Sequence, residues 1–166
     1  MTRPNRFATA IVAALTAGAV AGPALAGIGL PEASKEHWTA HTITEGRLAQ
    51  INAKGEGRFA VYCMPGDKKG AIFYREPAAA RDEVRAAGDK IDVVFTFDGA
   101  NKIERTMTWN EEGQYWTDPF GPNSPLADHM KRYYEVRINV KGHKGVDSDF
   151  TLKDSWRSIE TMFSGC

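Results

Sequence analysis

Hydrophobic and polar residues alternate along three stretches of the chain: KIDVVFTFDG (90–99), YEVRINVKG (134–142) and VDSDFTLKD (146–154). Successive side chains of a β-strand point to opposite faces, so this period of two predicts three half-buried strands. The apolar positions that share a face are Ile91, Val93, Phe95 and Phe97 in the first, Tyr134, Val136, Ile138 and Val140 in the second, and Val146, Ser148, Phe150 and Leu152 in the third. Such alternation is typical of antiparallel sheets with one wet face.

Further short strands are predicted at RFAVYCM (58–64), AIFYRE (71–76), KIERTMTW (102–109) and QYWTD (114–118), and HWTAHT (37–42) can form a first strand. Turn residues such as Asp98-Gly99 and Gly113 separate them. About seven or eight short strands at near-regular spacing predict a mainly β fold, an antiparallel β-sandwich or open barrel.

Three short helices are expected beside the strands. PAAARDEVRAAG begins at Pro77 and stops at Gly88, which predicts a helix near 77–87. A second is expected around SPLADHMKR (124–132). The tail predicts a third, which Asp154 or Ser155 can cap. Its apolar residues recur at spacings of three, four and three, as on one stripe of a helix: Trp156, Ile159, Phe163 and Cys166.

Residues 1–26, MTRPNRFATAIVAALTAGAVAGPALA, have the pattern of a secretory signal peptide. Arg3 and Arg6 precede an apolar stretch, and Ala24-Leu25-Ala26 fits the small-x-small cleavage site. The apolar stretch is shorter than the roughly 20 residues of a membrane span. We therefore expect one mature domain, residues 27–166, in the periplasm or secreted.

The charge of the mature chain excludes few functions but disfavours nucleic-acid binding. Without Arg3 and Arg6, 19 of the 21 basic side chains remain against 21 acidic ones, a net charge of −2. A nucleic-acid-binding protein usually has a basic surplus. No second stretch is apolar and long enough for a membrane span, so none is expected after signal cleavage.

Two cysteines, Cys63 and Cys166, lie in the mature chain. A secreted protein with two cysteines usually pairs them, so we expect a disulfide, with two buried thiols as the alternative. Cys63 shares a strand face with Phe59 and Val61, and Cys166 ends the predicted stripe of the tail helix. A bridge would attach that helix to the core face of the sheet.

The tail also carries a resemblance. The chain resembles the invasion-associated locus B-like periplasmic proteins of alphaproteobacteria, which combine a signal peptide, a β-rich body and a closing F-x-L-x-G-S phrase before a short helix. It departs from that phrase at Asp154 and Trp156, where a glycine and a small residue are expected. The resemblance implies a β-rich fold and an envelope location, and it transfers no catalytic residue. The matching residues are Phe150, Leu152, Lys153, Ser155, Ile159 and Cys166, with Cys63 as the partner.

Catalytic and metal-binding patterns are weak. His37 and His41 lie four residues apart and could share a face, but zinc requires a third ligand and the chain has no H-E-x-x-H. No G-x-S-x-G marks a nucleophile. We therefore expect no enzyme, catalytic residue, metal or cofactor; the alternative is a metal-assisted hydrolase that uses His37 and His41.

An aromatic group marks the candidate binding site: Trp109, Tyr115, Trp116 and Phe120, beside the Gly- and Pro-rich loop 118–125. These side chains either pair across a hairpin or form an exposed platform for a protein or glycan. We expect a non-catalytic binding module of the cell envelope that contacts an envelope or extracellular protein, for example in host interaction or hydrolase inhibition. A small-ligand carrier is the other alternative.

Overall fold

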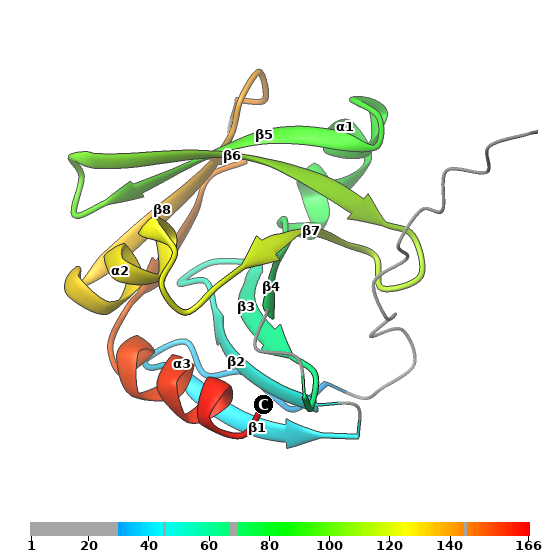
Figure 1. Ribbon diagram of the computed structural model, residues 1–166. Coiled ribbons are helices and arrows are strands. Elements are labelled where there is room, and N and C mark those ends of the chain that lie inside the picture. Colours follow the sequence, from blue (N-terminus) through cyan, green and yellow to red (C-terminus); the bar gives the residue numbers. More distant parts are fainter. Residues whose placement is uncertain (1–29, 45, 67–69, 145) are drawn as a thin grey trace, which may run out of the picture.

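The computed structural model describes residues 30–44, 46–66, 70–144 and 146–166 (Figure 1). The predicted signal peptide lies outside the described residues. Nine antiparallel strands form one curved sheet, which confirms the mainly β prediction and favours an open barrel over two stacked sheets. The spatial order is β1 (Thr39–Ile43), β2 (Gly46–Asn52), β3 (Arg58–Cys63), β4 (Gly70–Arg75), β7 (Tyr115–Phe120), β6 (Asn101–Asn110), β5 (Lys90–Phe97), β8 (Glu135–Val140) and β9 (Ser148–Thr151).

The two edge strands of the sheet are β1 and β9, and residues that flank β1 and β2 lie along the outer edge of β9. The backbone N–H of Trp38 donates to the Lys153 carbonyl at 2.9 Å, and the Trp38 indole N–H donates to Thr151 at 2.9 Å. The backbone N–H of Lys54 donates to the Asp149 carbonyl at 3.0 Å. The outer edge of β9 is thus satisfied by residues that flank β1 and β2, and the open sheet becomes a nearly closed barrel.

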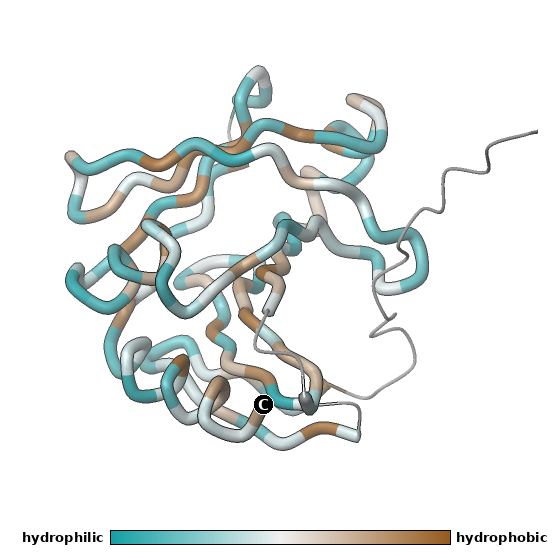
Figure 2. Tube along the Cα trace, viewed as in Figure 1, coloured by the Kyte–Doolittle hydropathy of each residue, from teal (hydrophilic) through white to brown (hydrophobic). Residues whose placement is uncertain are grey.

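Alternation predicts the inner face of the sheet correctly in most places. Phe59 lies at the centre of the core, with ring centroids 5.4 Å from Trp38 and 5.7 Å from both Phe95 and Phe150. The other predicted inward residues of β5, β8 and β9 are buried as well, and hydrophobic and hydrophilic segments follow one another along the strands in Figure 2. Tyr134 is the exception, because it precedes β8 and is 83% exposed.

Strand β2 was not predicted from the sequence because it lacks alternation. Leu48, Ala49, Gln50 and Ile51 are all buried, so both faces of this strand are covered. The segment from residue 30 to residue 34 lies over the outer face, where the Gln50 side-chain amide donates to the Pro31 carbonyl at 2.8 Å. The strand therefore lacks the alternation of apolar and polar residues that marks a half-buried strand in the sequence.

All three predicted helical segments are present. Residues 77–87 contain the 3-10 helix η1 (Ala78–Ala80) and α1 (Arg81–Ala86). Helix α2 (Pro125–Arg132) is capped by Ser124, whose hydroxyl accepts from the Ala127 N–H at 3.2 Å. Helix α3 (Ser155–Ser164) packs against α2 and against β1, β2 and β3 (Figure 1). No helix among the described residues is long and apolar enough to cross a membrane.

The predicted stripe of α3 is wrong at one end. Trp156 is 56% exposed, and the buried face consists of Ser155, Ser158, Ile159 and Met162. The helix is rotated relative to the predicted stripe because two small serines, rather than the indole, face the neighbouring elements.

The predicted caps of α3 are also absent. Asp154 occupies the N-cap position with a left-handed φ of 63° and makes no side-chain capping hydrogen bond. The Ser155 hydroxyl donates to the Met130 carbonyl of α2 instead. Ser155 therefore fixes the start of α3 to α2 rather than satisfying the backbone of its own helix.

Cys63 and Cys166 are paired, as predicted. Their Cα atoms lie 6.2 Å apart, and the bridge joins residues 103 positions apart in sequence. The N–H of Gly66 also donates to the Cys166 carbonyl at 2.8 Å. The last residue of the chain is thereby attached to the end of β3 and to the turn that follows it.

Glu76 is a buried carboxylate at the end of β4. It is 2% exposed, accepts from the Trp116 indole N–H at 3.1 Å, and lies 3.7 Å from the Arg81 guanidinium. Burial raises the pKa of Glu76 above its ordinary 4.5, because desolvation outweighs the attraction of Arg81. The folded state therefore holds this proton at pH values where the unfolded chain has released it.

Replacing Glu76 with glutamine should change how stability depends on pH. The stabilising effect of protonation is fully present below about pH 4.5 and is lost as pH rises through the raised pKa of the folded state. Relative to Glu76→Gln, the wild-type free energy of unfolding should fall as pH rises across that window, by at most about 1.4 kcal/mol per pH unit. Urea denaturation of both proteins across a pH series measures this difference. A wild-type free energy of unfolding that rises with pH relative to that of Glu76→Gln would show instead that the Arg81 pair dominates.

Candidate functional site

The aromatic residues predicted as an exposed platform are mostly internal. Tyr115, Trp116 and Phe120 are buried, and Trp109 is half-buried. Trp109 and Trp116 are opposite each other on β6 and β7, with ring centroids 5.0 Å apart, and the Arg85 guanidinium covers the Trp109 ring at 4.1 Å. The two tryptophans therefore stabilise the barrel by cross-strand packing, and the four side chains do not form an exposed platform.

The two candidate metal-binding histidines have local hydroxyl partners. His41 Nε2 lies 2.9 Å from the Thr39 hydroxyl, and His37 Nδ1 lies 3.4 Å from the Ser34 hydroxyl. Within the part of the chain that the structure describes, no three potential ligands gather around a metal position. The hydrolase alternative therefore gains no ligand set from these residues.

The interior of the sheet is occupied by side chains. Phe59, Phe95 and Phe150 fill its centre, and Trp38 closes it where the two edges meet. The small-ligand carrier alternative therefore has no observation in its favour at this position.

An open groove at the junction of α2, β8, β9 and α3 carries exposed aromatic groups. Among the described residues, the exposed large hydrophobic side chains are Tyr134, 83% exposed, and Trp156, 56% exposed. Both line this groove, which has a volume of about 730 Å³. Elsewhere in the described chain, large aromatic side chains are buried or half-buried, so this groove is where an apolar group of a partner would find aromatic surface.

The groove is also rich in positive charge. Four cationic side chains line it, against two carboxylates: Lys131, Arg132, Lys153 and Arg157, with Asp154 and Glu160. Lys131 donates to the Pro122 carbonyl at 3.3 Å. Within the described ranges, none of the other three cations forms an ion pair with a carboxylate.

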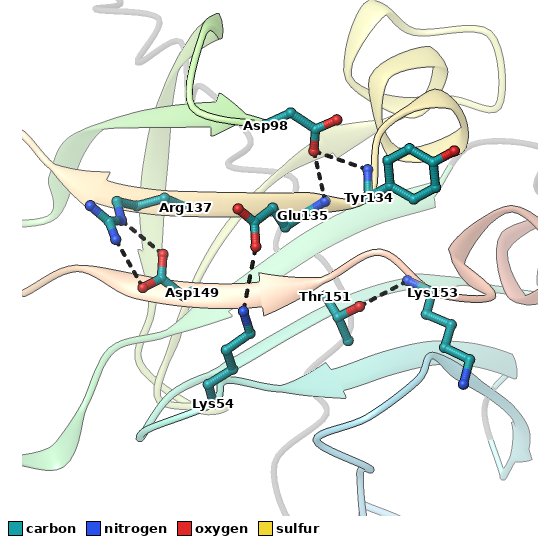
Figure 3. Close-up of polar contacts among 8 residues, drawn as sticks. All are labelled: Lys54, Asp98, Tyr134, Glu135, Arg137, Asp149, Thr151 and Lys153. Atoms are coloured by element: carbon teal, nitrogen blue, oxygen red, sulfur yellow. Dashed lines mark hydrogen bonds and ion pairs between the residues drawn. The ribbon is translucent and has the colours of Figure 1, made fainter.

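The neighbouring surface of β8 and β9 is different, because its charges are paired with one another (Figure 3). Arg137 donates to both carboxylate oxygens of Asp149, at 2.8 and 3.1 Å, and these hydrogen bonds hold the pKa of Asp149 below its ordinary value. Lys54 lies 3.4 Å from Glu135. The groove begins where these internal pairs end.

The backbone of the groove is held by hydrogen bonds. The Asp98 carboxylate accepts from the N–H groups of Tyr134 and Glu135, both at 3.0 Å (Figure 3). The Tyr134 carbonyl accepts from the Leu152 N–H at 2.7 Å. The exposed Tyr134 ring therefore projects from a fixed main chain, which lowers the entropy lost when a ligand binds.

Sequence reasoning missed this groove because its residues come from two separate segments. Two basic–aromatic clusters, KRYY (131–134) and KDSWR (153–157), were the available signal. The β8–β9 pairing brings them together, since it places Glu135 opposite Thr151.

Replacing Trp156 with alanine should leave stability nearly unchanged. The indole is exposed and forms no hydrogen bond within the described chain, so we expect a change of about 0.5 kcal/mol or less in the free energy of unfolding. Urea denaturation measures it. A loss of about 2 kcal/mol or more would mean that Trp156 has a structural role.

Comparisons with models of known protein families, with curated proteins and with solved structures found no match to this chain.

Proposed function

We propose that the protein is a non-catalytic binding module of the bacterial cell envelope that recognises a partner protein through the groove between α2 and α3. The observation that carries the proposal is that the exposed Tyr134 and Trp156 line the same groove, together with four cationic side chains. Tyrosine, tryptophan and arginine are the residue types that dominate protein-binding energies. Their gathering in a concave surface is typical of a recognition site.

The paired cysteines and the signal-peptide pattern support a compartment outside the cytoplasm. Disulfides persist in oxidising compartments such as the periplasm and the medium, and the Cys63–Cys166 pair supports that location. The resemblance to invasion-associated locus B-like proteins supports the same location. We therefore place the module in the periplasm or outside the cell, where it could contact an envelope protein, a host protein or a secreted hydrolase.

Quantitative affinity capture from envelope and medium fractions tests the proposal. Wild-type protein should retain a defined set of proteins that Tyr134→Ala/Trp156→Ala loses. A matched control, Lys35→Glu/Lys90→Glu, changes exposed side chains outside the groove and should retain the same set. Capture that the Tyr134→Ala/Trp156→Ala variant leaves unaltered would contradict a role for this groove.

A further inference from the structure

We infer that the groove binds an acidic segment of its partner, one that carries an aromatic or aliphatic side chain next to its carboxylates. The inference rests on the proposed function and specifies the chemistry of the partner. Three observations carry it: the charge distribution of the chain, the pairing of its cations, and the position of the exposed rings.

Charge on the mature chain is unevenly distributed. The groove has four cationic side chains and two carboxylates, whereas the rest of residues 27–166 holds the remaining 15 basic and 19 acidic side chains. The groove is therefore positive on a chain that is otherwise net negative. At physiological salt the screening length is about 8 Å, so a local surplus of this kind attracts an acidic segment to the groove while the remaining surface repels it.

The cations of the groove are available to a ligand. Arg137 on β8, Lys54 between β2 and β3, and Lys141 just after β8 each have a carboxylate of this chain within 3.4 Å. By contrast, Arg132, Lys153 and Arg157 form no ion pair in the described ranges and are exposed. A guanidinium without a partner can donate two parallel hydrogen bonds to a carboxylate, which gives both affinity and orientation.

The aromatic rings add an apolar contact that charge alone does not supply. Tyr134 and Trp156 lie on opposite segments of the same groove, on the α2–β8 connection and on α3. A volume of about 730 Å³ is within the roughly 300–1,000 Å³ of pockets that enclose small ligands, so a short peptide side chain and its neighbours would fit. A concave site of this size suits a protruding segment better than the flat surface of a membrane.

The carboxylates of the groove restrict how an acidic segment can lie. Asp154 and Glu160 belong to the side formed by α3, whereas Lys131 and Arg132 belong to the end of α2, where no carboxylate lines the groove. Like charges repel, so we expect the most acidic part of the ligand to lie toward α2 and its apolar side chain toward Trp156.

Selection from a library of short random peptides displayed on phage tests the inference with purified disulfide-bonded protein. We expect enriched sequences with a surplus of Asp and Glu beside an aromatic or aliphatic residue. A synthetic peptide of such a sequence should bind Arg132→Glu/Arg157→Glu at least about tenfold more weakly than wild type. The Lys35→Glu/Lys90→Glu control makes the same change in net charge outside the groove and should bind within about twofold of wild type. Circular dichroism confirms that each variant is folded.

The opposite results would overturn the inference. Enriched peptides without an acidic surplus, peptides that bind Arg132→Glu/Arg157→Glu as tightly as wild type, or no enrichment at all would each contradict it. So would binding of phosphatidylglycerol vesicles or heparin at this groove without binding of acidic peptides, because an anionic lipid or polysaccharide would then be the ligand. Neutral peptides that still require Tyr134 and Trp156 would contradict the acidic partner and leave the proposed function standing.

Discussion

Breaking the Cys63–Cys166 bridge should lower the free energy of unfolding by about 4 kcal/mol. The bridge closes a loop with a sequence separation of 103, and chain-entropy estimates for a loop of that size give roughly 4.7 kcal/mol, mainly by restricting the unfolded chain. The bridge also keeps the end of α3 at the end of β3. Without it, the buried Ile159 and Met162 and the hydrogen bond from Ser155 to Met130 still hold the start and middle of the helix, and its last turn should fray.

The measurement is urea denaturation of Cys63→Ala/Cys166→Ala, in which alanine avoids leaving a polar group at the buried position 63. Wild-type protein in a reducing agent is the matched control, because it retains both sulfur atoms and lacks only the bond. Both should unfold at clearly lower urea than the oxidised protein, and hydrogen exchange in α3 should accelerate. A loss below about 1 kcal/mol in the reduced protein would contradict the stabilising role of the bridge.

Replacing Trp38 with alanine should cost about 3–5 kcal/mol, the range observed when a large buried side chain is truncated. Trp38 is 2% exposed, packs edge-on against Phe59, and donates its indole N–H to Thr151 on β9. The substitution would leave a cavity at the core and remove one of the hydrogen bonds that join the sheet edges.

Two variants separate these contributions. Trp38→Phe retains a ring and loses the indole donor, so it should cost less than Trp38→Ala. We expect it to lower the free energy of unfolding by about 1–3 kcal/mol, because the Thr151 carbonyl loses its hydrogen-bond donor. Trp156→Ala makes the same chemical change at an exposed site and should cost about 0.5 kcal/mol or less. Equal losses for Trp38→Ala and Trp156→Ala in urea denaturation would contradict the difference in burial on which the account of the groove depends.

The sequence predicts the strands that have one wet face and fails where both faces are covered. In β5, Ile91, Val93 and Phe95 alternate with polar or less buried neighbours, and the strand is found where it is predicted. In β7, Tyr115 packs outward against Phe73 while Trp116 packs inward, and both are buried. Spacing alone could not show that side chains cover both faces of β7, so the prediction of an exposed aromatic platform was wrong.

The groove depends on tertiary contacts that no local pattern contains. KRYY and KDSWR are separated by two strands and meet because β8 and β9 pair in an antiparallel register. Trp156 was predicted to be internal from its spacing to Ile159, but Ser155 occupies the buried position and bonds to Met130. The small side chain of Ser155 at the contact with α2 thus shifts the buried face of the helix, and the indole of Trp156 is left exposed to solvent.

Site-specific photocrosslinking tests most directly that this groove is the binding surface. A photoreactive phenylalanine derivative is introduced at position 134, at position 156 and, as a control, at the exposed Asn101 in the β5–β6 hairpin, in cells that produce the protein. We predict that positions 134 and 156 form an adduct with the same protein, that position 101 does not, and that Arg132→Glu/Arg157→Glu reduces the adduct. Adducts at position 101 with none at positions 134 and 156 would contradict the account.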